Sequence, residues 1–280
     1  MVEIQRERLT ITLRNDLLSE LDARVDGINV RNRSHAIEIM LAKVLESKRV
    51  KKAVILAGGK GTRMRPFTYE MPKPMIPVKG KPLIQHIIEL CRKYDIREII
   101  LSIGYLGDKI REHFGDGSHL GVTIKYVEEK EEMGTAGPLN LAREYLDSPF
   151  LMFNGDVLSN VNLLDMIKFH NDQKCIATIG LTQVQDISSF GVVQLMGNKI
   201  VGFKEKPQGQ EDSRLINAGV YIFEPEILNF IPKGRAMLEK DVFPQLSEEG
   251  RLFGYPFTGQ WFDTGTPEAY EEAIKNWEGV

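Results

Sequence analysis

Cysteine is scarce in this sequence, and so are long apolar runs and a large excess of charge of either sign. The two cysteines, Cys91 and Cys175, each lie in an apolar stretch, and their spacing fits no zinc site. They are predicted to be buried thiols in a reducing compartment. No apolar segment reaches the length of a membrane span, and the N-terminus has no signal-peptide h-region. We therefore expect a cytoplasmic protein with no membrane partner.

The net charge of −3 over 280 residues argues against a protein that binds polyanions through charge alone. The charge is unevenly distributed, however. Residues 1–52 contain 11 Lys and Arg against 8 Asp and Glu, a balance of +3 that leaves −6 for the remainder. This asymmetry indicates an N-terminal module appended to a larger domain.

The N-terminal segment has the pattern of a strand followed by two helices. Arg8 to Leu13 alternates polar and apolar residues and is predicted to form a half-buried strand. Asn15 and Ser34 are predicted to cap the two helices, with a break at Gly27 and Asn29. A lone strand leaves both of its edges unpaired. The segment resembles the ribbon-helix-helix module, in which two chains pair their strands, and this resemblance implies a homodimer or a higher homo-oligomer.

From Lys51 onward, short apolar strands alternate with helices. Strands are predicted at residues 53–56, 98–103, 122–127 and 150–153, helices at 82–90 and 139–146, and a hairpin at 191–204. Such alternation is typical of a doubly wound sheet with right-handed crossovers. We therefore predict two domains: a ribbon-helix-helix-like dimerisation module in residues 1–49, and an α/β domain in residues 50–280. The second is expected to be a doubly wound, mixed but mainly parallel, Rossmann-like sheet.

A glycine-rich loop follows the first predicted strand of the larger domain. Leu56 to Met64 reads Leu-Ala-Gly-Gly-Lys-Gly-Thr-Arg-Met, and a Pro-Lys-Pro segment around Lys73 comes next. Glycines allow backbone N–H groups to approach phosphate oxygens. The loop is not a dinucleotide fingerprint, which needs glycine at Met64, nor a P-loop, which needs Ser or Thr at Gly61. Arg63 and Lys73 lie beyond the strand's carboxyl end, where such sheets bind ligands, and argue against a plain turn.

This loop, with its downstream Pro-Lys-Pro segment, resembles the sugar-phosphate nucleotidyltransferase family. That family includes mannose-1-phosphate guanylyltransferases and glucose-1-phosphate thymidylyl- and uridylyltransferases. The resemblance covers Lys51 to about Tyr270. Further motifs follow in the family's order: Gly134–Gly137, Asn154–Asp156, Phe203–Pro207, Asn217–Tyr221 and Trp261–Gly265. The resemblance implies an enzyme that joins a nucleoside triphosphate to a sugar 1-phosphate, with Mg²⁺ as cofactor, and releases pyrophosphate.

The resemblance also implies a role for each matching position. Nucleotide binding is implied for eight residues: Leu56, Ala57, Gly58, Gly59, Gly61, Thr62, Gly134 and Thr135. Three cations are implied to be catalytic, with the first two neutralising the pyrophosphate: Arg63, Lys73 and Lys206. Binding of the sugar phosphate is implied for Gly155, Glu205, Lys206 and Asn217. Two carboxylates are implied to hold Mg²⁺: Asp156 and Asp263.

General chemistry agrees with these roles. Mg²⁺ prefers few carboxylates together with phosphate oxygens and water, so two aspartates suffice. The attacking phosphate oxygen is largely ionised at neutral pH and needs no general base. Catalysis is expected from positioning and charge neutralisation during in-line displacement at the α-phosphate. Four histidines are accordingly predicted on helix or loop surfaces: His86, His113, His119 and His170.

Two segments indicate which nucleobase the enzyme uses. Gly134–Leu139 and Glu239–Pro244 resemble the guanylyltransferase versions of these regions. Mannose-1-phosphate guanylyltransferase, using GTP, is therefore our first hypothesis, and glucose-1-phosphate uridylyl- or thymidylyltransferase is the alternative. Four acidic residues offer a carboxylate for guanine N1–H and N2–H₂, or form only a solvated face: Glu128, Glu129, Glu131 and Glu132.

A protein of another class is also compatible with the sequence. In a DNA-binding regulator with a sugar-nucleotide-sensing domain, Thr10, Thr12 and the arginines beside them would enter the major groove. The module's charge of +3 offers few phosphate contacts, so dimerisation is favoured over DNA binding. A non-catalytic regulatory subunit is the third reading, and the retention of all the charged site residues argues against it.

Overall fold

The computed structural model describes residues 9–47, 50–184, 186–188, 190–205 and 213–280. The chain divides into two units, Met1–Lys48 and Arg49–Val280. Among the described residues, no helix combines the length and the apolar character that a membrane crossing requires.

The N-terminal unit contains helices α1 (Asn15–Ala23) and α2 (Arg33–Ser47). The Arg33 guanidinium lies 2.6 Å from the Asp22 carboxylate and links the two helices. The caps differ from those predicted. Asn15 is the first residue of α1 and gives no side-chain cap. At α2, the Oδ1 of Asn32 accepts a hydrogen bond from the backbone N–H of His35 at 3.0 Å, so Asn32 takes the position predicted for Ser34.

The strand predicted at Arg8–Leu13 is not formed within this single chain. Residues 9–14 have no regular structure, and Arg8 lies outside the described residues. A strand requires a hydrogen-bonding neighbour, and none of the described residues of the chain pairs with this segment. Leu9 and Ile11 of this segment are 79% and 47% exposed.

The larger unit is built on a sheet whose nine described strands have the order β5-β4-β1-β6-β11-β8-β12-β10-β9. These strands are β1 (Lys52–Ala57), β4 (Glu98–Ile103), β5 (Thr123–Glu128), β6 (Phe150–Asn154), β8 (Ala177–Gln183), β9 (Gly191–Met196), β10 (Lys199–Glu205), β11 (Leu215–Phe223) and β12 (Leu252–Pro256). Strands β5, β4, β1 and β6 run parallel, whereas β11 runs antiparallel to both β6 and β8. The predicted doubly wound, mixed sheet and the hairpin of β9 and β10 are therefore confirmed. The sheet is not mainly parallel as predicted, because only four of its nine described strand pairings are parallel.

The described part of this unit also contains two short ladders, six α-helices, several 3₁₀ turns and a π-helix, Leu238–Val242. The ladders pair β2 (Pro77–Val78) with β3 (Lys81–Pro82), and β7 (Val157–Ser159) with β13 (Trp261–Asp263). The helices are α3 (Leu83–Lys93), α4 (Gly107–Phe114), α5 (Gly137–Leu141), α6 (Leu163–Gln173), α7 (Phe243–Glu248) and α8 (Pro267–Asn276). Helix α5 is shorter than predicted, because a 3₁₀ turn at Arg143–Tyr145 replaces its second half.

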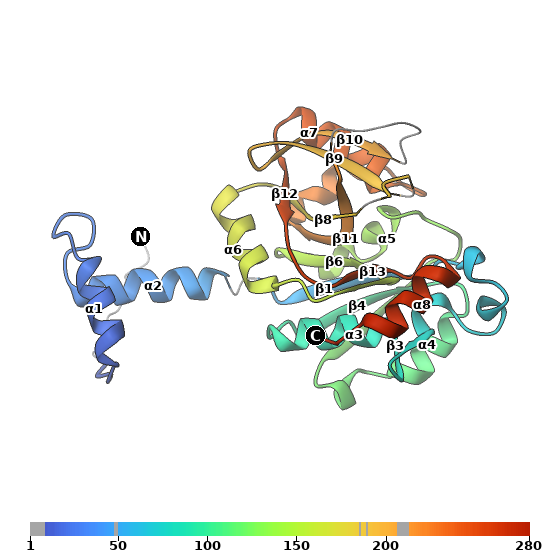
Figure 1. Ribbon diagram of the computed structural model, residues 1–280, viewed down its shortest axis with the longest axis horizontal. Coiled ribbons are helices and arrows are strands. Elements are labelled where there is room, and N and C mark those ends of the chain that lie inside the picture. Colours follow the sequence, from blue (N-terminus) through green and yellow to red (C-terminus); the bar gives the residue numbers. More distant parts are fainter. Residues whose placement is uncertain (1–8, 48–49, 185, 189, 206–212) are drawn as a thin grey trace. The chain divides into compact units, whose positions relative to one another are not determined.

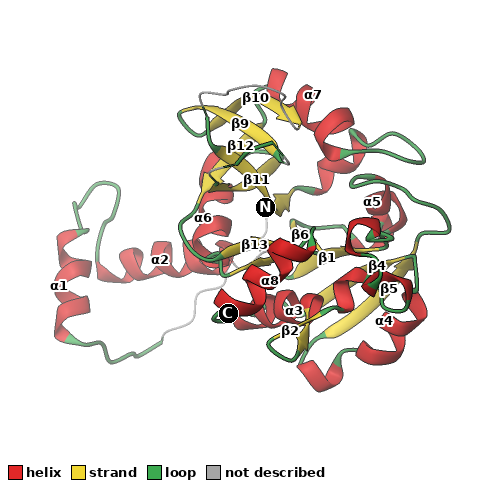
Figure 2. Cartoon of the chain, turned by 45° about the vertical axis from the view of Figure 1, so that its right-hand side comes forward, coloured by secondary structure: helices red, strands yellow, loops and turns green. Residues whose placement is uncertain are grey.

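Strand β1 shows why the sequence forms a sheet covered on both faces. Ala53 and Ile55 pack into a cluster with residues of α3, α4 and α6, whereas Val54 packs into another with residues of α5 and α7. The ribbon shows α4 and α5 on opposite sides of the parallel strands (Figures 1 and 2). A strand buried on both faces is apolar at consecutive positions, as this one is from Ala53 to Ala57.

The predicted positions of His86 and His170 are wrong, whereas His113 and His119 are exposed as predicted. His86 is 5% exposed; its Nε2 donates to the carbonyl oxygen of Val78 at 2.9 Å, and its Nδ1 accepts from Trp277 Nε1 at 3.2 Å. Burial lowers the pKa of His86 and keeps the ring neutral.

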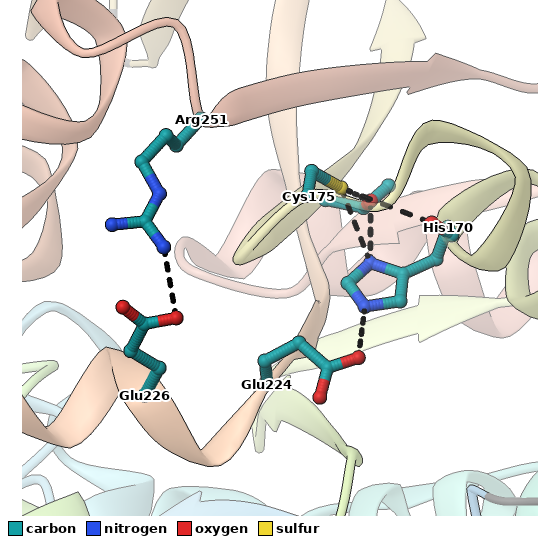
Figure 3. A network of polar contacts seen from close by, with 6 residues as sticks. His170, Cys175, Glu224, Glu226 and Arg251 are labelled. Atoms are coloured by element: carbon teal, nitrogen blue, oxygen red, sulfur yellow. Dashed lines mark hydrogen bonds and ion pairs between the residues drawn. The ribbon is translucent and has the colours of Figure 1, made fainter.

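His170 is 1% exposed and lies in a polar network with Cys175, Thr178 and Glu224 (Figure 3). Its Nδ1 is 2.8 Å from Thr178 Oγ1, and its Nε2 is 3.4 Å from Glu224 Oε1. Burial alone would lower the pKa of His170, but Cys175 and Glu224 together raise it to about 9. Both cysteines are buried, as predicted.

Candidate active site

A cavity of about 460 Å³ opens at the carboxyl ends of β1 and β6. It brings together most of the residues that the sequence implicated: Leu56, Gly58, Gly59, Gly61, Thr62, Arg63, Lys73, Gly134, Thr135, Gly155 and Asp156. Its size falls in the range of small-molecule sites. Ligands of open α/β sheets bind at this edge, so the cavity is the candidate active site.

Five other implicated residues are not among the described residues that line the cavity: Ala57, Glu205, Lys206, Asn217 and Asp263. Ala57 is buried within β1. The Asn217 side chain makes internal contacts instead: Nδ2 donates to the Tyr221 hydroxyl at 2.9 Å, and Oδ1 accepts from the Gly219 N–H at 3.0 Å. Lys206 and the side chain of Glu205 lie outside the described residues.

The glycine-rich loop ends in a 3₁₀ turn, Thr62–Met64, which carries Arg63. Gly61 begins this turn with a φ of +59°, and a Cβ at Gly61 would lie 2.8 Å from the Cβ of Lys73. The hydroxyl of Thr68 donates to the Gly61 carbonyl oxygen at 2.9 Å. The absence of a side chain at Gly61 thus allows Lys73 to pack directly beneath the loop.

Gly155 brings the end of β6 against the end of β1. Its N–H donates to the Leu56 carbonyl oxygen at 2.9 Å, and any Cβ at this position would collide with that same oxygen. Asp156, the next residue, is consequently held beside the glycine-rich loop. The Nζ of Lys73, a residue that is only 7% exposed, donates to Asp156 Oδ2 at 2.5 Å.

Asp263 reaches the same place through the small ladder of β7 and β13, in which it pairs with Val157. Thr264 fixes this arrangement, because its N–H and its hydroxyl both donate to the Asp156 carbonyl oxygen, at 3.0 and 2.8 Å. A Cβ at Gly265 would lie 2.9 Å from Asp263 Oδ1 and 3.0 Å from an Arg63 guanidinium nitrogen. Glycine at 265 therefore leaves room for both side chains.

The pKa values of the two aspartates are shifted in opposite directions. Burial alone would raise the pKa of Asp156, but Lys73 and Arg63 hold it below its usual range. Burial and the neighbouring Asp156 raise the pKa of Asp263. Two partly desolvated carboxylates placed together form a hard-oxygen donor set that suits Mg²⁺. Asn154 Oδ1 is buried beside them without a hydrogen-bond partner. Among the described residues no third His, Cys, Asp or Glu joins the pair, so phosphate oxygens and water would supply the remaining ligands.

Glu129 also lines the cavity and lies against Gly58 of the glycine-rich loop. Its Oε1 accepts from the hydroxyl of Ser102 at 2.8 Å, and its Oε2 from the Met133 N–H at 3.4 Å. Burial raises the pKa of Glu129, and the nearby Glu132 adds to the effect. The structure thus distinguishes Glu129 and Glu132, which line the cavity, from Glu128 and Glu131 of the same acidic run.

Another part of the cavity wall is built from two segments about 100 residues apart. The Ala136 N–H donates to the Ala236 carbonyl oxygen at 2.9 Å, and the Ala236 N–H donates to Met133 at 3.0 Å. Gly134, with a φ of +75°, has no room for a Cβ against the Ala236 carbonyl oxygen. The Thr135 hydroxyl is engaged within the protein, because it donates to Glu239 Oε2 at 2.7 Å.

Sequence reasoning missed two lining residues from the second segment, Arg235 and Met237. The Arg235 guanidinium is 67% exposed and lies 3.6 Å from the Glu132 carboxylate. The only signal for them was their position shortly before Glu239–Pro244, the segment that carries the guanylyltransferase resemblance.

Comparisons with known proteins show what the chain is similar to. The nucleotidyl transferase family profile matches residues 52–279. The chain is 40% identical over 225 residues to the mannose-1-phosphate guanylyltransferase catalytic subunit beta of Danio rerio, covering 78% of this chain and 62% of the relative. It is 38% identical over 242 residues to the UTP–glucose-1-phosphate uridylyltransferase of a Synechocystis species, covering 80% and 62%. The chain thus spans less than two thirds of each of these relatives.

A solved structure shows the same fold. HddC from Yersinia pseudotuberculosis, in complex with GMP-PN, superposes with a TM-score of 0.71 at 26% sequence identity. The superposition covers 82% of this chain and 100% of that one.

Proposed function

Because this chain belongs to the nucleotidyl transferase family, we propose that it transfers a nucleotidyl group from a nucleoside triphosphate to a sugar 1-phosphate. The observation that carries the proposal is the convergence of the glycine-rich loop, Arg63, Lys73 and Asp156 in one cavity. A cation pair beside a carboxylate at a glycine-rich turn suits a polyphosphate with a bound divalent metal.

In the proposed reaction, a phosphate oxygen of the sugar 1-phosphate attacks the α-phosphorus of the triphosphate. The bond from that phosphorus to the bridging oxygen breaks, and pyrophosphate leaves with the electron pair. Backbone N–H groups of the loop hold the phosphates, and Arg63 and Lys73 neutralise the charge that develops on the leaving group. Asp156 and Asp263 would hold Mg²⁺, which when bound adds positive charge at the phosphoryl oxygens.

We propose GTP as the nucleotide and mannose 1-phosphate as the acceptor. Guanine presents two adjacent donors, N1–H and N2–H₂, which complement the two oxygens of the Glu129 carboxylate. Uracil and thymine present one N–H between two carbonyl oxygens, which a carboxylate repels. The Danio rerio relative supports the same choice. The Synechocystis relative keeps glucose-1-phosphate uridylyltransferase as the alternative.

A substrate panel tests this proposal. Five nucleoside triphosphates are offered with mannose 1-phosphate or glucose 1-phosphate, and pyrophosphate release is measured. GTP with mannose 1-phosphate is expected to give the highest kcat/KM. Glu129→Gln is expected to lower kcat/KM for GTP about tenfold or more, because it replaces one acceptor of a charge-assisted pair with a donor.

The matched control for that variant is Glu131→Gln, which changes an exposed residue of the same acidic run. It is expected to leave the nucleotide preference unchanged. UTP or dTTP exceeding GTP tenfold in the wild-type panel would overturn the guanine assignment and support the uridylyl- or thymidylyltransferase alternative.

We also propose that the N-terminal module pairs with a second copy of this chain. Leu9 and Ile11 alternate with Thr10 and Thr12, so pairing of two such strands would cover their apolar face. Deleting residues 1–49 is expected to lower the oligomeric mass while pyrophosphate release persists, because the cavity residues all lie in the other unit.

Light scattering measures the oligomeric mass of the deletion variant and of two full-length point variants. Ile11→Lys places a charge on the apolar face and should dissociate the oligomer, whereas Thr12→Lys, on the other face, should not. A deletion variant with the wild-type oligomeric state would refute the pairing. Tight, salt-dependent DNA binding by the full-length protein would favour the regulator hypothesis for this module.

A further inference from the structure

We infer that Ser102 is a positioning residue that sets nucleobase selectivity by fixing the Glu129 carboxylate in the cavity wall. The inference rests on the proposed reading of guanine by Glu129. It adds a buried residue that acts through Glu129 and that lies near the end of a largely apolar strand. Nothing in the sequence pattern of β4 indicated a role for it.

Ser102 lies one residue before the end of β4, between β1 and β5 in the sheet. It is fully buried, and its neighbours Leu101 and Ile103 are buried apolar residues. A hydroxyl in such surroundings costs free energy unless it is hydrogen-bonded. Its Oγ donates to Glu129 Oε1 at 2.8 Å, so the buried donor is satisfied by a carboxylate of the cavity wall.

The Glu129 carboxylate keeps two hydrogen-bond acceptor positions available for a base. An ionised carboxylate has about four lone-pair positions. Ser102 uses one on Oε1, and the Met133 N–H uses one on Oε2. One position on each oxygen remains, which matches the paired donors of guanine. Ser102 and Met133 approach from β4 and from the loop after β5, so together they fix the plane in which the remaining positions point.

Gly58 of the glycine-rich loop packs against the same carboxylate. A Cβ at Gly58 would collide with Glu129 Oε1 and would lie 2.8 Å from its carboxyl carbon. The adjacent Gly59 differs, because a Cβ there meets no described atom within 4 Å. The chain therefore offers two neighbouring glycines in one loop, of which only the first constrains the Glu129 carboxylate.

A double-mutant cycle with Ser102→Ala and Glu129→Gln tests the inference. The readout is the ratio of kcat/KM for GTP to that for UTP, together with the ratio of their binding constants by calorimetry. Ser102→Ala is expected to lower both ratios about tenfold, or about 1.4 kcal/mol. In the Glu129→Gln background it is expected to change neither ratio, because Ser102 acts through Glu129. Ser159→Ala, a buried serine of β7, is the control.

Glycine variants of the phosphate loop give an independent second test. Gly58→Ala is expected to lower the GTP-to-UTP ratio as Ser102→Ala does, whereas Gly59→Ala is expected to leave that ratio unchanged whatever its effect on turnover. A Ser102→Ala variant that weakens both nucleotides equally would show a merely structural role and overturn the inference. Wild-type protein that binds GTP and UTP equally would overturn it as well.

Calorimetry separates this inference from the proposed reaction. If no triphosphate yields pyrophosphate, the proposed function fails, but the ratio of binding constants still decides whether Ser102 sets the base preference. If pyrophosphate is released but Ser102→Ala keeps the wild-type GTP-to-UTP ratios, the proposed reaction is supported and the inference about Ser102 is wrong.

Discussion

Asp156→Asn is expected to lower kcat by about two orders of magnitude or more at saturating Mg²⁺, and Asp263→Asn to have an effect of similar size. Each change removes a negative charge from the pair of carboxylates that would hold Mg²⁺, and losses on this scale follow removal of one strong electrostatic group. Asp156→Asn has a second consequence, because it leaves the buried Lys73 ammonium without its carboxylate partner. We therefore expect a lower thermal stability for Asp156→Asn.

Steady-state pyrophosphate release across a Mg²⁺ titration measures both variants, and thermal unfolding checks that each is folded. Asp172→Asn, which changes an exposed residue of α6, is the control and should behave like wild type. If both site variants turn over at the wild-type rate with Mg²⁺, the two aspartates do not hold the metal. A rise in the Mg²⁺ concentration needed for half-maximal rate would agree with the assignment.

The parallel half of the fold could be predicted because its signals are local. Each buried strand is a short apolar run, and β1 is apolar at consecutive positions because both of its faces are covered. The glycine-rich loop is equally local, since Gly58, Gly61, Arg63 and Lys73 lie within one short segment. The cavity joins these residues because they all follow the carboxyl end of one strand.

Contacts between residues far apart in the chain could not be predicted from the sequence. Asp156 and Asp263 meet only because β13 pairs with β7 and Thr264 binds the Asp156 carbonyl oxygen. Their meeting was implied by the family resemblance and not by any spacing. Glu129 and Ser102 likewise come together across two strands, and an acidic run by itself does not show which carboxylate turns inward.

His170 illustrates a signal that was present but given too little weight. It follows Leu163, Met166 and Ile167 at helical spacing, so it continues the buried face of α6. A polar residue on such a face needs polar partners. Here Thr178 Oγ1 lies 2.8 Å from Nδ1, and the partly exposed Glu224 carboxylate lies 3.4 Å from Nε2. The N-terminal strand is the opposite case, because its pattern is clear but its proposed partner is another chain.

Arg63→Ala is expected to lower kcat by about two orders of magnitude with a much smaller change in KM for the triphosphate. The charge on the leaving pyrophosphate is greatest in the transition state, so a cation aimed at that charge acts mainly on kcat. The structure places Arg63 for this task. It lies on the 3₁₀ turn that closes the glycine-rich loop, exposed to the cavity, with its guanidinium beside Gly265.

Two further arginine variants make the measurement specific. Arg63→Lys keeps the charge but loses the planar fork of donors, so it is expected to recover only part of the lost rate. Arg65→Ala is the control, because the Arg65 guanidinium lies 5.0 Å from the centre of the Tyr69 ring and is not among the described residues of the cavity wall. Steady-state kinetics with varied triphosphate gives kcat and KM separately. An Arg63→Ala variant with wild-type kcat and a raised KM would mean that Arg63 only holds the substrate. Neutralisation of the charge on the leaving pyrophosphate would then be assigned to Lys73.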